Sequence, residues 1–135
     1  MYEAQDISST VWCRVIPGIK RVAARCPDVD WTSMVLLQEL LERRTRLYLD
    51  DAHPRDFLII RLDYNTRRHE IELFIRVAYS SAGDARALYR EKLIKLAQYF
   101  GAARITMQSS RQGFRERPEW TPLSTLYALE VPREQ

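Results

Sequence analysis

Hydrophobic and polar positions alternate along the chain with two periods, one typical of helices and one typical of strands. Apolar residues recur at close to helical spacing between Val11 and Ala24, which predicts a first helix. Pro17 and Gly18 fall inside this stretch, so the pattern indicates a kinked helix or two short turns. Residues 1–10 show no such stripe and are expected to form a lead-in segment.

A second helix is predicted from about Trp31 to Arg44. Asp28 or Asp30 stands just before it, where an aspartate can cap the free N–H groups of the first turn. The buried face of this helix is expected to consist of apolar residues, namely Met34, Leu37, Leu40 and Leu41.

Several stretches are typical of strands, and they comprise residues 46–50, 57–62, 69–79, 103–108 and 125–131. The stretch 57–62 is almost continuously apolar, as expected for a central strand that is buried on both faces. Turn residues that begin at Asn65 follow it, which predicts a hairpin and an antiparallel pair.

The clearest helical pattern covers residues 85–100. Its predicted buried face comprises Tyr89, Leu93, Leu96, Ala97 and Phe100. Gly101 stands where a helix ends in a left-handed residue. Because this helix connects two strands, it favours a parallel pair at this point of the sheet.

These elements predict an α+β protein with a mixed, mostly antiparallel sheet flanked by helices. The chain has 135 residues and no repeat or linker, so we expect residues 1–135 to form a single domain. No apolar stretch approaches the roughly 20 residues of a membrane-spanning helix. The N-terminus lacks the pattern of a signal peptide, so we expect no membrane association.

The charge composition raises the possibility of a nucleic-acid partner. The net charge is only +3, but 18 of the 21 basic residues are arginines, and arginine binds phosphate through two parallel hydrogen bonds. A coding sequence rich in G and C would produce the same bias. His53 and His69 are the only histidines and stand apart from other metal-ligating residues, so no metal site is expected.

Four stretches share their order with a known fold: residues 11–17 (VWCRVIP), 40–49 (LLERRTRLYL), 96–102 (LAQYFGA) and 110–115 (SRQGFR). Together they resemble the GNAT-type N-acetyltransferase fold, in particular small GNAT-like proteins of tailed bacteriophages. The resemblance extends over about residues 11–131. It implies a virion or the host cytoplasm as the location.

The resemblance also implies where acetyl-coenzyme A would bind, namely at the start of the long helix. Of the phosphate-binding pattern, the matching stretch retains only the last small residues, Gly83 and Ala85, and the leading Gln or Arg is absent. If acetyl-coenzyme A binds, the candidate contacts are Ser81, Gly83 and Ala85. Asp84 adds a negative charge there, and either Ser81 or Asp84 would equally serve as a helix cap. Glu72 is a candidate base, and Tyr99 or Tyr127 a candidate acid, although no spacing requires these roles.

Two functional hypotheses follow. The first is a virion-associated structural protein that uses a GNAT-like scaffold without a cofactor, binds other virion proteins and has no acetyl-transfer activity. The alternative is an acetyl-CoA-dependent N-acetyltransferase. A contact surface for a partner or for DNA is expected at four arginines, which are Arg104, Arg111, Arg115 and Arg117. The arginines are equally expected to pair with neighbouring glutamates, and the oligomeric state is left open.

Overall fold

A computed structural model describes residues 1–27, 29–108, 121–123 and 126–132. The chain divides into two compact units. Unit 1 comprises Met1–Ile60 and Val77–Leu88, and unit 2 comprises Arg61–Arg76 and Tyr89–Gln135. The predicted single domain over residues 1–135 therefore stays a prediction.

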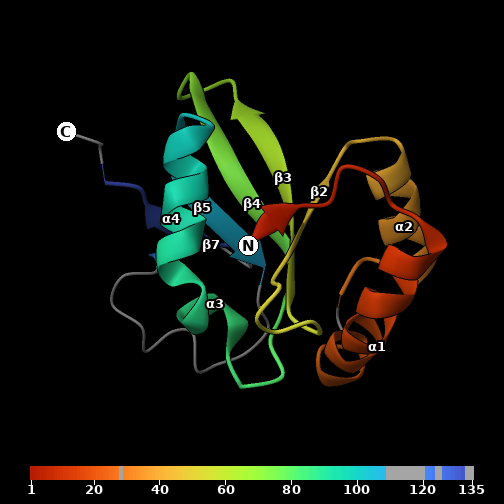
Figure 1. The fold of residues 1–135 in the computed structure, drawn as a ribbon. Coiled ribbons are helices and arrows are strands. Elements are labelled where there is room, and N and C mark those ends of the chain that lie inside the picture. The colour runs from red at the N-terminus through yellow and green to blue at the C-terminus, as the bar shows by residue number, and fades with distance from the viewer. Residues whose placement is uncertain (28, 109–120, 124–125, 133–135) are drawn as a thin grey trace. The chain divides into compact units, whose positions relative to one another are not determined.

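The described strands form one sheet in the order β1-β2-β3-β4-β5-β7-β6 (Figure 1). The strands are β1 (Tyr2–Glu3), β2 (Arg46–Leu49), β3 (Phe57–Asn65), β4 (Glu70–Tyr79), β5 (Ala102–Gln108), β6 (Thr121–Leu123) and β7 (Leu126–Glu130). β4 and β5 pair in parallel, whereas the pairs β1–β2, β2–β3, β5–β7 and β6–β7 are antiparallel. The predicted mixed, mostly antiparallel sheet and its parallel crossover are confirmed.

The described helices are α1 (Ser9–Arg25), α2 (Ser33–Leu41), α3 (Ala85–Leu88) and α4 (Arg90–Tyr99). None of them is both long enough and apolar enough to span a bilayer. Within residues 1–10, the expected lead-in, β1 pairs with β2 and α1 begins at Ser9. The strand β6 was not predicted at all.

In unit 1, α1 is a single helix that begins after Ser8, whose Oγ accepts a hydrogen bond from the Val11 N–H at 3.2 Å. Pro17 lies within this helix, so of the two predicted alternatives, a kinked helix or two short turns, the second is wrong. The neighbouring Gly18 is buried against the sheet. A Cβ at this position would stand 2.7 Å from ring atoms of both Phe57 and Tyr79, which explains why the helix carries a glycine here.

The predicted boundaries and buried face of α2 are partly wrong. Thr32, not an aspartate, caps the helix, and its Oγ1 accepts a hydrogen bond from the Val35 N–H at 3.3 Å. The buried residues of the helix are Leu36, Glu39 and Leu40. Of the four residues predicted to be buried, only Leu40 is; the rest are Met34 and Leu41, which are exposed, and Leu37, which is half-buried.

The core of unit 1 lies between these two helices and the adjoining strands (Figure 1). Its buried members are Val15, Ile19, Trp31, Leu36, Leu40, Leu47, Leu49, Phe57, Ile59, Val77 and Tyr79. Phe57 and Tyr79 lie with their ring centroids 5.8 Å apart, and Arg21 Nη1 donates to the Tyr79 hydroxyl at 2.8 Å. The strand residues of this cluster therefore have little room to move.

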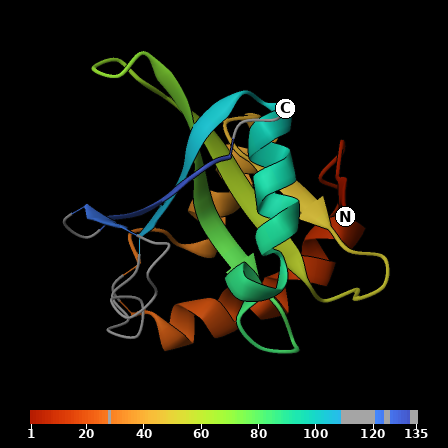
Figure 2. The same cartoon turned by 90° about the vertical axis from the view of Figure 1, so that its left-hand side faces the viewer.

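In unit 2, α4 packs along β5 (Figure 2). Leu93, Leu96 and Ala97 are buried as predicted. The expected helix over residues 85–100 is instead interrupted at Tyr89, which separates α3 from α4. Gly101 has φ +71°, so the predicted left-handed helix end is confirmed.

The turn that begins at Asn65 is also present in unit 2. The Asn65 side-chain oxygen accepts hydrogen bonds from the N–H groups of Arg67 and Arg68, both at 3.1 Å. Such a side-chain contact stabilises a tight turn without any partner from outside the loop. The hairpin signal in the sequence was therefore correct.

Candidate functional site

The turn between β4 and α3 contains all three residues that the sequence suggested for cofactor binding. Ser81, Gly83 and Ala85 follow β4 within unit 1, and the first two are exposed while Ala85 is buried. The structure thus places them in one turn and the first helical position after it. The geometry of this turn decides what it can bind.

A buried carboxylate holds the beginning of the turn. Asp56 has 2% of its surface exposed and accepts three hydrogen bonds. They come from the Ser80 hydroxyl at 2.8 Å, the Ser81 N–H at 3.0 Å and the Ser81 hydroxyl at 3.2 Å. Both donors of Ser81, its N–H and its hydroxyl, therefore point to Asp56 and not towards a ligand in this conformation of the turn.

The next two amides of the turn are used within the turn as well. The Ala82 N–H donates to the Ser80 hydroxyl oxygen at 3.1 Å. The Gly83 N–H points to the Ser80 carbonyl oxygen at 3.4 Å, a long contact that a stronger acceptor would replace at little cost. Of the three amides from Ser81 to Gly83, that of Gly83 is thus held least tightly.

Gly83 is also the position where a ligand can approach the backbone closely. Its φ is +140°, a conformation that only glycine adopts readily, and nothing lies within 4 Å of the place where a Cβ would stand. The backbone at Gly83 is therefore open to a close approach from outside the turn.

Asp84 caps the start of α3. Its Oδ1 accepts a hydrogen bond from the Arg86 N–H at 3.1 Å and lies 3.5 Å from Nε of the same arginine. The capping role predicted for Ser81 or Asp84 therefore belongs to Asp84. The carboxylate occupies a backbone donor and a guanidinium that would otherwise attract a phosphate.

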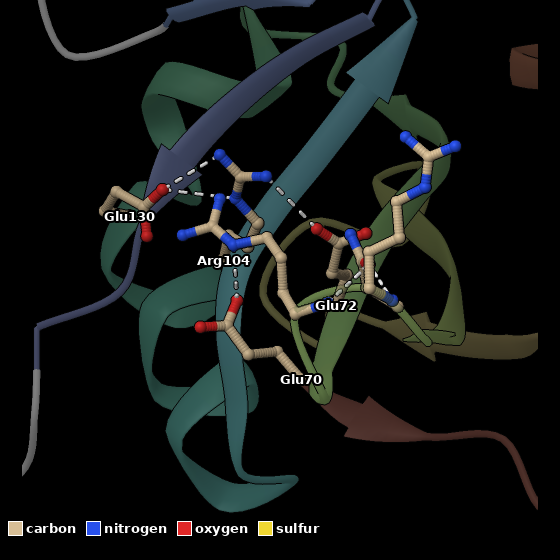
Figure 3. Close-up of polar contacts among 7 residues, drawn as sticks. Glu70, Glu72, Arg104 and Glu130 are labelled. Atoms are coloured by element: carbon tan, nitrogen blue, oxygen red, sulfur yellow. Dashed lines mark hydrogen bonds and ion pairs between the residues drawn. The ribbon is translucent and has the colours of Figure 1, made fainter.

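The candidate base Glu72 lies in a network of ion pairs in unit 2 (Figure 3). Its Oε2 is 3.4 Å from Arg104 Nη1, and Arg104 Nη2 is 3.0 Å from Glu130 Oε1. The side chains of Glu72 and Arg104 are 15% and 10% exposed, whereas that of Glu130 is 65% exposed. The register explains the network, because Glu72, Arg104 and Glu130 face one another across β4, β5 and β7.

Glu70 lies beside this network on the same strand. Its Oε2 is 3.3 Å from Arg68 Nε, so it pairs with the arginine that precedes β4 (Figure 3). Glu70 and Glu72 thus each lie within ion-pair distance of an arginine, and the described contacts of Glu72 are those of a structural ion pair.

The two candidate acids have different surroundings. Tyr99 is 81% exposed near the end of α4, where its ring packs edge-on against Phe100 with 5.0 Å between centroids. Tyr127 pairs through the backbone with Met107 of β5, and its side chain lies outside the described residues. Tyr99 therefore lies on the exposed side of α4, outside the predicted buried face of this helix.

One of the four arginines predicted to form a contact surface is not on the surface. Arg104 is 8% exposed and its guanidinium pairs with two carboxylates, so it is buried instead of available to a partner. The residues next to Arg104 in the sequence do not indicate that its side chain is buried. Arg111, Arg115 and Arg117 lie outside the described residues.

Asp56 is the site residue that the sequence did not reveal. The pattern marked it only as part of a turn, because its partners Ser80 and Ser81 follow 24 and 25 residues later. Nothing in the sequence between them signals that contact. The described residues also include no group of three His, Cys, Asp or Glu side chains that is arranged to hold a metal ion.

Comparison with solved structures supports the fold. The chain is similar to a protein described as "Crystal structure of a probable acetyltransferase", with a TM-score of 0.62 and 14% sequence identity, over 92% of this chain and 97% of that chain. At this identity the likeness shows an acetyltransferase-like fold and nothing finer. No protein-family model and no curated protein matches the sequence.

The expected mixed, mostly antiparallel sheet flanked by helices is therefore confirmed as an acetyltransferase-like fold. The phage origin expected from the resemblance has no support in this comparison and stays a prediction.

Proposed function

We propose that the protein is an acetyl-CoA-dependent N-acetyltransferase. The similarity to a probable acetyltransferase over 92% of the chain supports this function more directly than it supports a structural role. The observation that carries the proposal is the open backbone at Gly83, which follows the strand that pairs in parallel with β5. A diphosphate needs such a close approach to backbone amides.

Acetyl-CoA would supply an activated thioester carbonyl, and the chain would supply the binding surface. The backbone at Gly83 would contact the diphosphate. Asp56 would keep the turn in shape through its contacts with Ser80 and Ser81. Asp84 would have to release the Arg86 N–H for that amide to take part, so we expect modest affinity.

A scaffold without acetyl-transfer activity is the second candidate. The specific observation that favours it is the use of the Ser81 and Arg86 amides by the carboxylates of Asp56 and Asp84. When carboxylates of the chain already accept hydrogen bonds from the backbone N–H groups of a turn, a phosphate forms fewer new hydrogen bonds there. The virion location and the contact with DNA or other virion proteins are predictions that belong to this candidate.

Ligand-dependent stability separates the two candidates. Acetyl-CoA is titrated up to about 1 mM against the purified protein while the melting temperature is recorded. A ligand that binds only the folded state stabilises it by about 2.7 kcal/mol at a concentration of one hundred times Kd. A rise with acetyl-CoA and with CoA, followed by amine-dependent release of free thiol, is the expected result.

A pair of glycine variants provides the control. Gly83→Ala and Gly101→Ala both place a side chain on a residue with positive φ, and in both cases nothing lies within 4 Å of the new Cβ. Both variants should lose stability through backbone strain, by about 1–2 kcal/mol where the left-handed region is involved. Only Gly83→Ala should also abolish the response to acetyl-CoA.

An unchanged melting temperature of the wild-type protein at 1 mM acetyl-CoA would refute the proposal and favour the scaffold. Equal loss of the response in both glycine variants would show that Gly83 is not the contact, even if the ligand binds elsewhere.

A further inference from the structure

The outer surface of α2 is apolar and exposed. Met34 is 69% exposed, Leu41 60% and Val35 40%, while Leu37 is half-buried. We call these four residues the α2 apolar face. The helix lies beside α1 in unit 1, and its opposite side, with Leu36 and Leu40, is buried in the core (Figure 1).

The exposed residues lie together because of helical geometry. Met34, Leu37 and Leu41 are separated by three and four positions, so they stand above one another on one side of the helix. Gln38 lies in the middle of the same side and donates to Glu42 Oε1 at 2.9 Å. A stripe of leucine and methionine at this spacing, exposed to water, is typical of a surface that binds another helix.

The charges at the two ends of α2 have opposite sign. Asp30 is exposed shortly before the first residue of the helix. Arg43 and Arg44 are exposed immediately after its last turn. Arg44 Nε also contacts Glu42 Oε2 at 2.8 Å, but 59% of its side chain stays exposed, so it can interact further.

We propose that the α2 apolar face binds the same face of a second copy of this chain, with the two helices antiparallel. The face is symmetric about the position between Leu37 and Gln38. An antiparallel partner therefore places Met34 opposite Leu41 of the other copy. The same arrangement brings the acidic end of each helix to the basic end of the other and opposes their dipoles.

The charge pattern favours this occupant over an acidic partner. An acidic partner would place a like charge next to Asp30. A second copy places an opposite charge next to both ends of the helix. The apolar face covers a few hundred Å² at most. That is small beside the roughly 1,200–2,000 Å² of a stable interface, so we expect a weak dimer.

Sedimentation equilibrium between about 10 μM and 1 mM protein tests this interface. The wild-type chain should pass from monomer to dimer over this range. Met34→Ser combined with Leu41→Ser should lower the association constant at least tenfold, and both sites tolerate the change because they are exposed. Leu88→Ser is the matched control, since Leu88 is a 56% exposed apolar residue on α3, and it should associate like the wild type.

A charge exchange at Gln38 tests the two-fold symmetry itself. With the two-fold axis between Leu37 and Gln38, Gln38 lies opposite Leu37 and beside Gln38 of the second copy. Gln38→Glu alone and Gln38→Lys alone should therefore each weaken the dimer, because two like charges then lie close together. An equimolar mixture of the two variants should recover association and should do so less strongly at high salt. Circular dichroism confirms that each exposed variant remains folded.

A wild-type chain that remains monomeric at 1 mM would overturn the proposal. So would a dimer that survives the Met34 and Leu41 changes, because another surface would then form it. Vesicles of phosphatidylserine and phosphatidylcholine are included as a parallel probe. A monomeric wild-type chain that sediments with these vesicles, while the Met34 and Leu41 double variant does not, would assign the face to a membrane. That result would refute self-association.

Discussion

Gly18 offers the sharpest test of how α1 packs on the sheet. In a helix interior, replacement of glycine by alanine normally stabilises the protein by up to about 1 kcal/mol. Here the structure predicts the opposite sign. The new Cβ would stand 2.7 Å from Phe57 Cε1, 2.7 Å from Tyr79 Cδ1 and 3.0 Å from Tyr79 Cγ, well inside ordinary contact distance.

The two rings cannot yield freely. Phe57 is 0% exposed and Tyr79 5%, and the Tyr79 hydroxyl is held by Arg21. Overpacking a filled core costs about 1–3 kcal/mol. Because the new Cβ would clash with two rings, we expect a cost in the upper part of that range. The gain in helix propensity lowers this cost by about 1 kcal/mol. Gly18→Ala should therefore destabilise the protein by about 1–2 kcal/mol.

Urea unfolding followed by circular dichroism measures this change as a lower midpoint at constant slope. Ala24→Gly provides the control, since Ala24 is exposed on the same helix and reports the propensity effect alone. Phe57→Leu makes room beside Gly18. In that background Gly18→Ala should cost clearly less, and the difference is the coupling between the two positions.

The reasoning fails if Gly18→Ala stabilises the protein by about the amount that Ala24→Gly costs. It also fails if the effect of Gly18→Ala is the same with and without the Phe57 ring. Either result would mean that α1 does not approach the sheet as closely as the structure shows.

Two further substitutions test the buried charges. Arg104→Met should destabilise the protein by about 3 kcal/mol in urea unfolding, because it leaves Glu72 unpaired at 15% exposure. Adding Glu72→Met should recover most of that loss, and failure to recover would argue against the ion pair. Asp56→Ala removes three hydrogen bonds from Ser80 and Ser81 and should cost about 2–4 kcal/mol. Asp56→Asn should cost less, and the Ser81 amide should exchange with solvent faster in both variants; unchanged exchange would exclude Asp56 as its acceptor.

The sequence predicted most elements because their signals are local. β4 and β5, the α4 face with Leu93 and Leu96, and the end at Gly101 all follow from periodicity and from glycine at the position that needs positive φ. The parallel pair followed from the helix between the strands. Such patterns depend on neighbours within a few residues, which the sequence displays directly.

The predicted buried face of α2 was partly wrong because apolar residues occupy almost every position of that helix. Its sequence, SMVLLQELL, contains a possible stripe on more than one side. Only the packing of Leu36 and Leu40 into the core decides which side is buried. Helix periodicity cannot distinguish a core stripe from an interaction stripe when both are apolar.

The candidate site depended even more on contacts between distant residues. By itself the sequence determined the turn after β4, its glycine and two possible capping residues, Ser81 and Asp84. Only the tertiary structure decided that Asp56 holds Ser81 and that Arg104 is buried between Glu72 and Glu130. These partners are 25, 32 and 26 positions apart, so they meet only once the strands pair. A charged residue looks the same in sequence whether it faces water or a buried partner, because burial is a property of the assembled sheet.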